Sequence, residues 1–569
     1  MASEVSGLFD LATDLMSDSN ENLVAEKKLL AEVNQKPLLS RWGTFAKLSG
    51  PGWLQGAITL GGGSLAGSLY VGVIGGYQML WLQPLMMIFG VLMLSVIGYV
   101  TLSTGEKPFG AINKHISPVL GWGWLIAAML ANLVWAMPQF ALGTAAMQQN
   151  LQIMEGDSGK YFCAFLLFLI GGAVVWSYDS GSKGVKIFEI ILKVMVAVVV
   201  LSFFGVVVVM ASKGSLDWNA IFSGLIPNPS LLFEPAERYK EIITQSGDPK
   251  YWEGVILSSQ HDRMITAAAT AVGINMTFLL PYSMLRKGWG KEHRGLATFD
   301  LSLGLFLPFF IATTCVVIAA SSQFHGEVFD KKLINLPAQK ITGPYATNLE
   351  NRLKAEIGEE VFQKLTDEEK SSRLNALPVA DKRLAAMIIK RDANTLANSL
   401  ENLTESRTIS QIVFGIGVVG MAISTIIILM LINGFAFTEM LGARIGGAKH
   451  RIGAMLPGVT GLLGYLWFWR GDKPDFWLAV PTSVFGMVLL PIAYISFFLM
   501  INSKTLMGDA MPKGGKRLGL NIAMVVALGA ATLGAGTAIW NKVQWTGVIG
   551  VVIFIGMAVI VHFTRSKNA

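Results

Sequence analysis

Long apolar runs alternate with short polar connections along most of the chain. A helix rises about 1.5 Å per residue, so about 20 apolar residues cross the hydrocarbon core of a bilayer. The pattern therefore predicts an all-α polytopic membrane protein with about twelve spans. By residue number, the apolar runs are 49–76, 79–103, 118–147, 160–177, 186–211, 264–285, 297–321, 409–436, 453–469, 476–501, 519–540 and 545–565.

Two polar stretches interrupt this pattern, at residues 213–262 and 323–408. The second carries charges of both signs and helix-like runs, so we expect a small helical cap outside the membrane. The first 40 residues contain no early apolar core, and we expect no cleavable signal peptide. Leucines at helical spacing in this N-terminal segment fit an interfacial helix, a docking segment or a disordered one equally well.

Composition and charge agree with a membrane protein. Only 15% of the residues are charged, against about 25% in soluble domains. Lysines and arginines of short connections, among them Arg286 and Lys449, fall on one side if both termini are cytoplasmic. This bias explains the net charge of +7, so nucleic acid is not an expected partner. We expect a multi-pass protein of the plasma or bacterial inner membrane, with the lipid bilayer and a small solute or ion as partners.

A run of small residues lies in the middle of the first apolar segment. Gly61, Gly62 and Gly63 are followed by Ser64, and each glycine costs a helix about 1 kcal/mol relative to alanine. An interrupted helix at membrane depth is tolerated where it is buried in protein or lines a cavity, and transporters bind substrates at such breaks. The sixth segment has its own interruption signal in Asn275, Thr277 and Pro281. The sequence therefore predicts a solute site between these two segments.

Several short motifs resemble those of one transporter family. They occur in the family's order and at its spacing, over most of residues 45–510, and the resemblance is to the Nramp divalent-metal transporters. The motifs are Gly50-Pro51-Gly52, Gly75-Gly76-Tyr77-Gln78-Met79-Leu80-Trp81, Thr104-Gly105-Glu106-Lys107, Glu189, Asp300, Leu490-Pro491-Ile492-Ala493 and Leu506-Met507-Gly508.

The resemblance implies a LeuT-type core of two five-helix inverted repeats, with spans one and six broken at mid-membrane. Applied to this chain, it divides the sequence into five parts, given with their expected roles. These are an N-terminal cytoplasmic segment (1–45), a first repeat (46–212), an external loop (213–262), a second repeat with an external insert at 323–408 (263–502), and two appended spans with a tail (503–569).

The chain departs from the family at the positions that bind metal. Nramp transporters use Asp-Pro-Gly-Asn in span one and Met-Pro-His in span six. In the matching register the aspartate becomes Gly61, the asparagine Ser64, the methionine Leu280 and the histidine Tyr282. This register predicts a site without a carboxylate and without a thioether, the soft ligand that helps to select transition metals.

Acidic residues of the family's proton route are also missing, because the acidic third-span positions fall at about Leu130, Met137 and Phe140. Two further acidic residues are expected to make structural contacts. Glu189 is expected to pair with Lys186 or Lys193 on its own helix. Asp300 is expected to make a contact at a helix start or a gate.

Three functions remain open. The altered site accepts an anion or a polar neutral solute at the N-terminus of a half-helix, or it carries a divalent cation such as hydrated Mg²⁺, or the chain is a receptor that does not transport. We favour the first, and expect neither Mn²⁺ or Fe²⁺ symport with protons nor a cofactor. No catalytic triad or nucleotide loop indicates an enzyme. The residues expected to contact substrate are Thr59, Gly61, Gly62, Gly63, Ser64, Asn275, Thr277, Leu280 and Tyr282.

Overall fold

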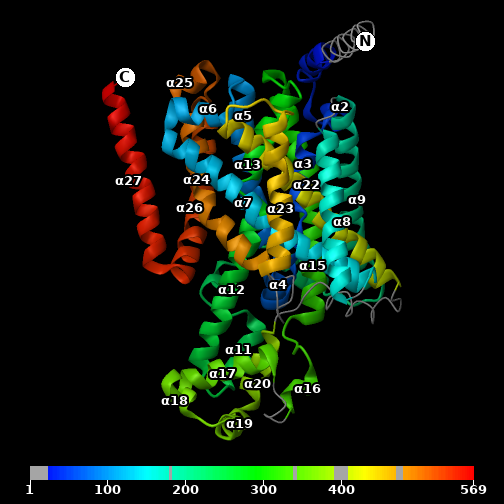
Figure 1. The fold of residues 1–569 in the computed structure, drawn as a ribbon, viewed down its shortest axis with the longest axis vertical. Helices are drawn as coiled ribbons and strands as arrows, with labels where there is room; N and C mark the ends of the chain where they lie inside the picture. Colours follow the sequence, from blue (N-terminus) through cyan, green and yellow to red (C-terminus); the bar gives the residue numbers. More distant parts are fainter. Residues whose placement is uncertain are drawn as a thin grey trace.

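The computed structural model describes residues 23–154, 156–178, 182–336, 342–389, 408–468 and 479–568, which form a helical bundle with a smaller helical unit at one end (Figure 1). The helices at the twelve predicted apolar runs are, in chain order, α3 with α4 (Pro51–Thr59 and Gly62–Gly75), α5 (Leu82–Thr104), α7 (Pro118–Ala145), α8 (Gly156–Tyr178), α9 (Ser182–Ser212), α12 with α13 (Pro249–Ala271 and Met276–Arg286), α14 with α15 (Arg294–Leu301 and Leu307–Phe324), α22 (Phe414–Met440), α23 (Ala448–Phe468), α24 (Ala479–Asn502), α26 (Gly514–Lys542) and α27 (Gln544–Asn568).

Shorter elements connect these spans. The helices are α2 (Leu38–Leu48), α6 (Pro108–Ala111), α10 (Trp218–Gly224), α11 (Glu237–Thr244), α16 (Lys331–Ile334), α17 (Gly343–Ile357), α18 (Glu359–Lys364), α19 (Asp367–Ala376), α20 (Val379–Met387) and α25 (Lys504–Met507). Single turns are η1 (Gly76–Met79), η2 (Ile112–Ile116), η3 (Ala146–Asn150), η4 (Pro229–Leu232), η5 (Lys291–His293), η6 (Ser302–Phe306), η8 (Thr408–Val413) and η10 (Gly508–Ala510).

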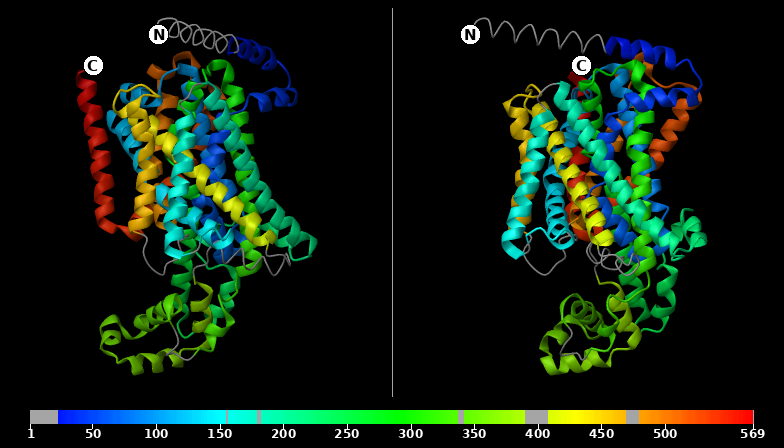
Figure 2. Two further views of the ribbon diagram at one scale, coloured as in Figure 1. Left: turned by 45° about the vertical axis from the view of Figure 1, so that its right-hand side comes forward. Right: turned by 90° about the vertical axis from the view of Figure 1, so that its right-hand side faces the viewer.

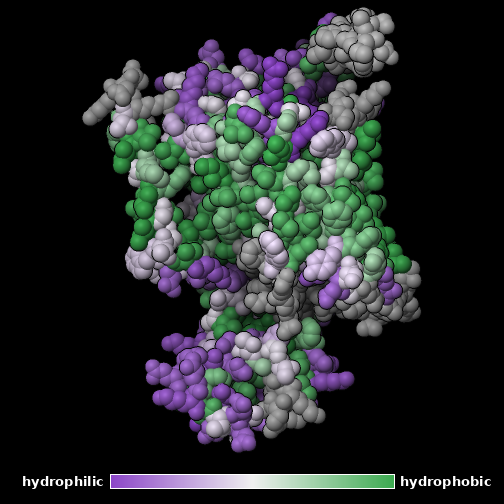
Figure 3. Space-filling model, viewed as in Figure 1, coloured by the Kyte–Doolittle hydropathy of each residue, from purple (hydrophilic) through white to green (hydrophobic). Residues whose placement is uncertain are grey.

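The predicted membrane architecture is confirmed. Within the described residues, ten segments are long and apolar enough to cross a bilayer, and the bent pair α3 and α4 makes an eleventh. α23, at the ninth predicted run, is not among these segments, but it packs against α22 and α7 within the bundle. The hydropathy of the surface agrees, because apolar residues cover the sides of the bundle while the smaller unit is mostly polar (Figure 3). The bundle is therefore built to sit in lipid.

Both predicted helix breaks occur. α3 and α4 meet at an angle of 53°, since Leu60 and Gly61 leave the helical conformation between them. α12 ends at Ala271 and α13 begins at Met276, with Val272 in an extended conformation. Pro281 lies inside α13, so the proline is not the point of interruption. The two broken spans cross near the middle of the bundle, where α22 supplies a fully buried run from Ile426 to Ile432.

The helical insert projects from the end of the bundle opposite α2 and the end of α27 (Figure 1). This external unit consists of α16 to α20 together with α11 and the first turns of α12. α12 begins at Pro249, earlier than the apolar run that predicted it, because its polar first part packs outside the membrane on this unit. α11 packs against both α12 and α20, so the loop at 213–262 and the insert fold against each other.

Charged groups gather at the end of the bundle where α3 begins. The Asp300 carboxylate accepts the backbone N–H groups of Gly50 and Gly52, at 3.0 and 2.6 Å, so it caps the first turn of α3 as a helix-start contact. Among the described residues, the Glu189 carboxylate pairs with Lys287, at 2.9 Å, and not with the predicted Lys193. The side chain of Lys186, the other predicted partner, lies outside the described residues. Lys193 instead donates to the Ser49 carbonyl at 3.1 Å. Tertiary packing supplies a partner that helical spacing does not show.

Candidate functional site

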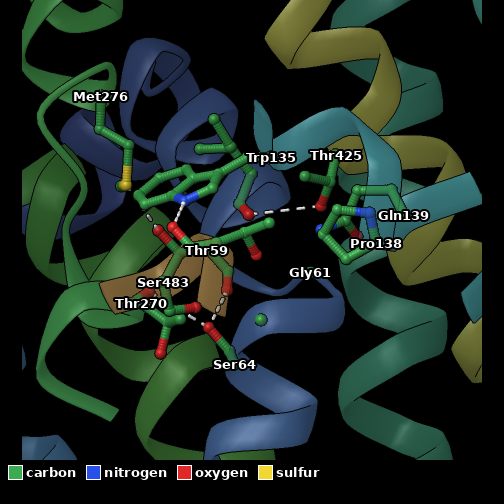
Figure 4. Close-up of a pocket in the computed structure, with 13 residues that line it drawn as sticks. Thr59, Gly61, Ser64, Trp135, Pro138, Gln139, Thr270, Met276, Thr425 and Ser483 are labelled. Carbon is green, nitrogen blue, oxygen red and sulfur yellow. Dashed lines mark hydrogen bonds between the residues drawn. The ribbon is translucent and has the colours of Figure 1, made fainter. Parts of the chain in front are cut away.

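A small cavity lies where the two broken spans cross (Figure 4). Its volume is about 40 Å³. The walls come from the breaks of α3–α4 and α12–α13 and from facing residues of α7, α22 and α24. The residues that line it are Ile58, Thr59, Gly61, Gly63, Ser64, Trp135, Pro138, Gln139, Thr270, Met276, Thr425, Thr482 and Ser483.

The first break is fixed by side chains from two neighbouring helices. The Gly62 N–H donates to the Gln139 side-chain oxygen at 2.8 Å, which satisfies one of the orphan donors at the start of α4. A Cβ atom at Gly61 would collide with the Thr425 hydroxyl, so glycine lets the chain pass close to α22. The N–H groups of Gly63 and Ser64 also begin α4 and have no acceptor within the helix.

The Ser64 hydroxyl bridges the two breaks. It donates to the Thr59 carbonyl, at the end of α3, and lies 3.2 Å from the Thr270 carbonyl near the end of α12. Both carbonyls are among the last of their helices, where intrahelical donors are missing. One serine therefore ties the C-terminal ends of both half-helices together beside the cavity.

A thioether lies in the cavity wall, contrary to the prediction from the sequence. Met276 is the first residue of α13, and its Sδ accepts the Thr59 hydroxyl at 3.2 Å and the Gly273 N–H at 3.4 Å. The register with the family motif places a methionine at Leu280, one helical turn further on. The chain breaks before Met276, so this residue takes the position at the break. A weakly held sulfur is thus available at the site.

An aromatic wall closes the other side of the cavity. Trp135 of α7 donates from Nε1 to the Thr482 carbonyl at 2.7 Å. A Cβ atom at Gly273 or at Gly486 would collide with its ring, so two glycines leave room for the indole. Figure 4 shows Trp135 between Met276 and Thr425. The ring and Pro138 limit the size of any occupant.

The predicted span-one residues come together at this cavity. Thr59, Gly61, Gly63 and Ser64 line it, and Gly62 belongs to the same turn through its hydrogen bond to Gln139. Their arrangement follows from the glycine run, which lets α4 restart at a new angle. The sequence therefore indicates the location of one wall of the cavity.

The predicted span-six residues lie beside the cavity instead of in its wall. Asn275 caps α13 by accepting the Met276 N–H, and it donates to Asn132 at 2.9 Å. Thr277 donates to the Ile274 carbonyl and accepts Trp124 Nε1, the latter at 2.8 Å. Both side chains are buried, and these hydrogen bonds join them to other protein groups.

Leu280 and Tyr282 lie further along α13. The Tyr282 ring stacks on Phe278, with centroids 4.5 Å apart, and faces Phe435 at 6.1 Å. Leu280 is buried and faces Gly98 of α5. Neither residue lines the cavity. They form part of the packing between α13 and its neighbours.

Other wall residues had no motif to mark them. Gln139, Thr270, Thr425 and Ser483 are polar residues within apolar runs, a pattern that identifies bundle-facing positions in a membrane helix but does not say which of them meet. Only the packing of α7, α12, α22 and α24 around the two breaks brings them together.

The cavity carries no formal charge. No Asp, Glu, His, Lys or Arg lines it, and the part of the chain that the structure describes contains no cluster of three or more His, Cys, Asp or Glu suited to a metal ion. Hydroxyls, carbonyls, an amide and one thioether are the available groups. These groups can form hydrogen bonds or coordinate a small solute, but they supply no formal charge to balance an ion.

A family model now gives these observations a context. The model described as natural resistance-associated macrophage protein-like, or Nramp, matches residues 52–336 and 382–536. The chain belongs to the Nramp family. Among curated relatives, "Metal transporter Nramp2" of Oryza sativa subsp. japonica is 28% identical over 168 residues, which are 28% of this chain and 30% of the relative. The match thus spans less than a third of that relative's length.

Solved structures show the same fold. The manganese transporter of Eremococcus coleocola, crystallised in a mutant form and in complex with an aromatic bis-isothiourea substituted compound, aligns with a TM-score of 0.59 in both structures. Each alignment covers 92% of this chain and 94% of the other, at 12% identity. This confirms the Nramp-type arrangement of the core for this family member. The cavity described above lies between the broken helices of that core.

Proposed function

We propose that this Nramp family member transports a divalent metal cation through the cavity between its broken spans, and that the ion keeps part of its water shell there. The observation that carries the proposal is the Met276 sulfur beside the Thr59 hydroxyl at the crossing of α3 and α13. Oxygen ligands suit Mg²⁺ and Mn²⁺, and a thioether adds preference for softer ions. Mn²⁺ accepts both kinds of ligand.

The helix ends add support for a cation. α3 and α12 both end at the cavity, and the C-terminus of a helix carries a partial negative charge. The Thr59 and Thr270 carbonyls belong to these ends and meet at Ser64. Relatives named as a metal transporter and a manganese transporter point the same way.

The missing carboxylate sets how the ion must be held. A bare divalent ion in a site without negative charge pays a large desolvation cost. A volume of about 40 Å³ accommodates more than one water-sized sphere, since one such sphere needs about 10–15 Å³. An ion that retains one or two waters fits this space and loses less hydration energy. We therefore expect weaker binding than a carboxylate site would give.

The proposal includes transport without a proton exchanged at this site. None of the cavity residues titrates between pH 5 and 8. Asp300, Glu189 and Lys287 gather instead around the start of α3, and their partners are protein groups. Cation flux should therefore depend little on a pH gradient.

A second candidate, an anion or polar neutral solute, has one observation in its favour. The Gly63 and Ser64 N–H groups begin α4 at the cavity, where the positive end of the helix dipole attracts negative charge. No acidic side chain opposes such a solute. The small volume restricts this reading to ions or molecules of only a few atoms.

Uptake by proteoliposomes tests the proposal. We expect Mn²⁺ and Mg²⁺ to enter vesicles that contain the protein, and Met276→Leu to reduce Mn²⁺ uptake more than Mg²⁺ uptake because only the softer ion gains from sulfur. Met284→Leu is the matched control, since Met284 is buried on the same helix away from the cavity.

Three results would contradict it. Uptake of a small anion but of neither cation would favour the second candidate. Equal losses with Met276→Leu and Met284→Leu would assign the sulfur a packing role. No flux of any solute, with a folded protein, would favour a receptor that does not transport.

A further inference from the structure

α2 has an exposed apolar stripe. Leu39, Trp42, Gly43 and Ala46 follow the spacing i, i+3, i+4, i+7 and therefore share one face of the helix. Leu39 is 75% exposed and Trp42 55% exposed, while Gly43 and Ala46 are also exposed. A Cβ atom at Gly43 would meet nothing within 4 Å. The Trp42 ring touches Phe299 at one edge of this face, with centroids 6.2 Å apart, and the rest of the face is exposed.

An adjoining face anchors α2 to the bundle. Phe45 is 4% exposed and packs on Phe299 of α14, with ring centroids 5.6 Å apart. Phe299 lies in the first turns of the seventh span, so the contact places α2 at the level where that span begins. α2 also lies across the spans instead of along them, at the end of the bundle away from the external unit (Figure 2).

The charges of α2 are all positive. Arg41 and Lys47 are its ionisable residues, and Lys36 comes just before it. Arg41 Nε donates to the Lys36 carbonyl at 2.6 Å, and Lys36 and Lys47 are exposed. A helix with an apolar face and basic flanks, lying in the plane of a membrane surface, is attracted to anionic headgroups as well as to the acyl boundary.

We propose that α2 is a lipid-binding helix whose Leu39–Trp42 face enters the interface and whose Arg41 and Lys47 bind anionic phospholipid headgroups. The indole of Trp42 suits the headgroup level, where tryptophan is enriched in membrane proteins. The bilayer that surrounds the bundle is the occupant that the position and charge of α2 favour over a soluble protein.

Hydrogen bonds at Ser49 connect α2 to the first half-helix, α3. Ser49 joins α2 to α3: its hydroxyl donates to the Ala46 carbonyl at 2.9 Å and accepts Trp53 Nε1 at 3.1 Å. Lys193 of α9 donates to the Ser49 carbonyl. These bonds make the junction stiff, so a shift of α2 in the interface moves the start of α3. The lipid composition then acts on the half-helix that leads to the cavity.

Fluorescence quenching in the full-length protein tests the proposal without a transport assay. An environment-sensitive dye is attached to Ala46→Cys, since Cys163 and Cys315 are buried. The protein is placed in vesicles of phosphatidylcholine alone or of phosphatidylcholine with phosphatidylglycerol. We expect lipid-borne quenchers to reach the dye, and more strongly with phosphatidylglycerol.

A charge variant separates the headgroup contribution. Arg41→Gln with Lys47→Gln should lower the ratio of lipid-inserted to detached helix roughly thirtyfold in the anionic vesicles and leave the neutral vesicles nearly unchanged. Lys513→Gln with Lys516→Gln is the control, because both lysines are exposed and predicted to lie on the same membrane side. A dye quenched mainly by aqueous iodide, or shielded from both quenchers by a protein, would overturn the proposal. So would equal effects of the two double variants.

Discussion

The cavity and the external unit both bury polar groups, but only the external unit buries charged side chains. In the external unit the Asp381 carboxylate is fully buried and accepts Arg352 Nε at 2.9 Å, Trp252 Nε1 at 2.9 Å and the Gly247 N–H at 2.7 Å. The cavity contains hydroxyls, carbonyls and a thioether and has no charged side chain.

The difference shows what each region is built to do. A buried charge is stable only when donors satisfy its oxygen atoms, and those donors then hold it in one place. Asp381 therefore fixes α20 to α12 and α17. Groups around a transported ion must instead release it, so neutral ligands with weak bonds suit the cavity better. The Thr59 hydroxyl donates to the Met276 sulfur at 3.2 Å. This bond is weak, so both groups can leave it to contact an ion at little cost.

Removing the buried charge should have the largest effect. Asp381→Asn removes the buried charged partner of Arg352, which is 2% exposed and keeps only the half-exposed Glu356 at 2.9 Å. Breaking a buried pair costs about 3–5 kcal/mol. Limited proteolysis of the external unit should become faster and its unfolding midpoint should fall. Glu359→Gln removes an exposed ion pair with Lys354 and serves as control. Equal behaviour of the two variants would contradict the role given to Asp381.

Adding a charge to the cavity should have the next largest effect. Gly61→Asp needs space that the Thr425 hydroxyl occupies, so it is combined with Thr425→Ala. A carboxylate about 4 Å from a divalent ion should raise affinity roughly tenfold to a hundredfold. Calorimetric titration with Mn²⁺ measures this against Thr425→Ala alone. Unchanged affinity in a folded double variant would show that the cation does not bind beside Gly61.

The smallest effect is expected at an exposed carboxylate. Glu369 accepts the Thr366 N–H at 2.8 Å and the Thr366 hydroxyl at 3.1 Å in a capping box. These bonds lower the pKa of Glu369 from its ordinary value of 4.5. Because the pKa is depressed in the folded state, the cap stabilises α19 fully above the ordinary value. This stability is lost as the pH falls through the lower, folded-state pKa.

A pH series of thermal unfolding checks this expectation. With Glu369→Gln, the unfolding temperature of the external unit should fall slightly less as the pH is lowered. Glu368→Gln, a neighbour on the same turn, should leave this pH dependence unchanged. The same acid dependence in both variants would show that the cap contributes nothing measurable.

The membrane fold is largely readable from the sequence. Apolar runs of about 20 residues predict spans because lipid leaves no other partner for the backbone. The glycine run at 61–63 predicts the first break for a related reason, since three adjacent glycines weaken a helix. The order of short motifs then indicates the family, which the match over residues 52–336 and 382–536 confirms.

The sequence predicts the span-one wall of the site but not its span-six wall. The register with the family motif led to Leu280 and Tyr282, but the second helix restarts at Met276, and the cavity forms around that residue. Where a helix breaks depends on which neighbours can satisfy its freed backbone groups. Gln55 of α3 donates to the Met276 carbonyl at this break, while Asn132 and Trp124 of α7 bond the side chains of Asn275 and Thr277. Such partners are far away in sequence, as Lys287 is for Glu189, and no local pattern shows them.

A structure of the protein with Mn²⁺, in which anomalous scattering locates the ion, tests directly whether a cation binds between the broken spans. We expect one peak in the cavity, within ligand distance of Met276 Sδ and of the Thr59 or Ser64 oxygen atoms, with water completing the shell. A peak among the charged groups at Asp300 and Glu189, with none in the cavity, would contradict this expectation.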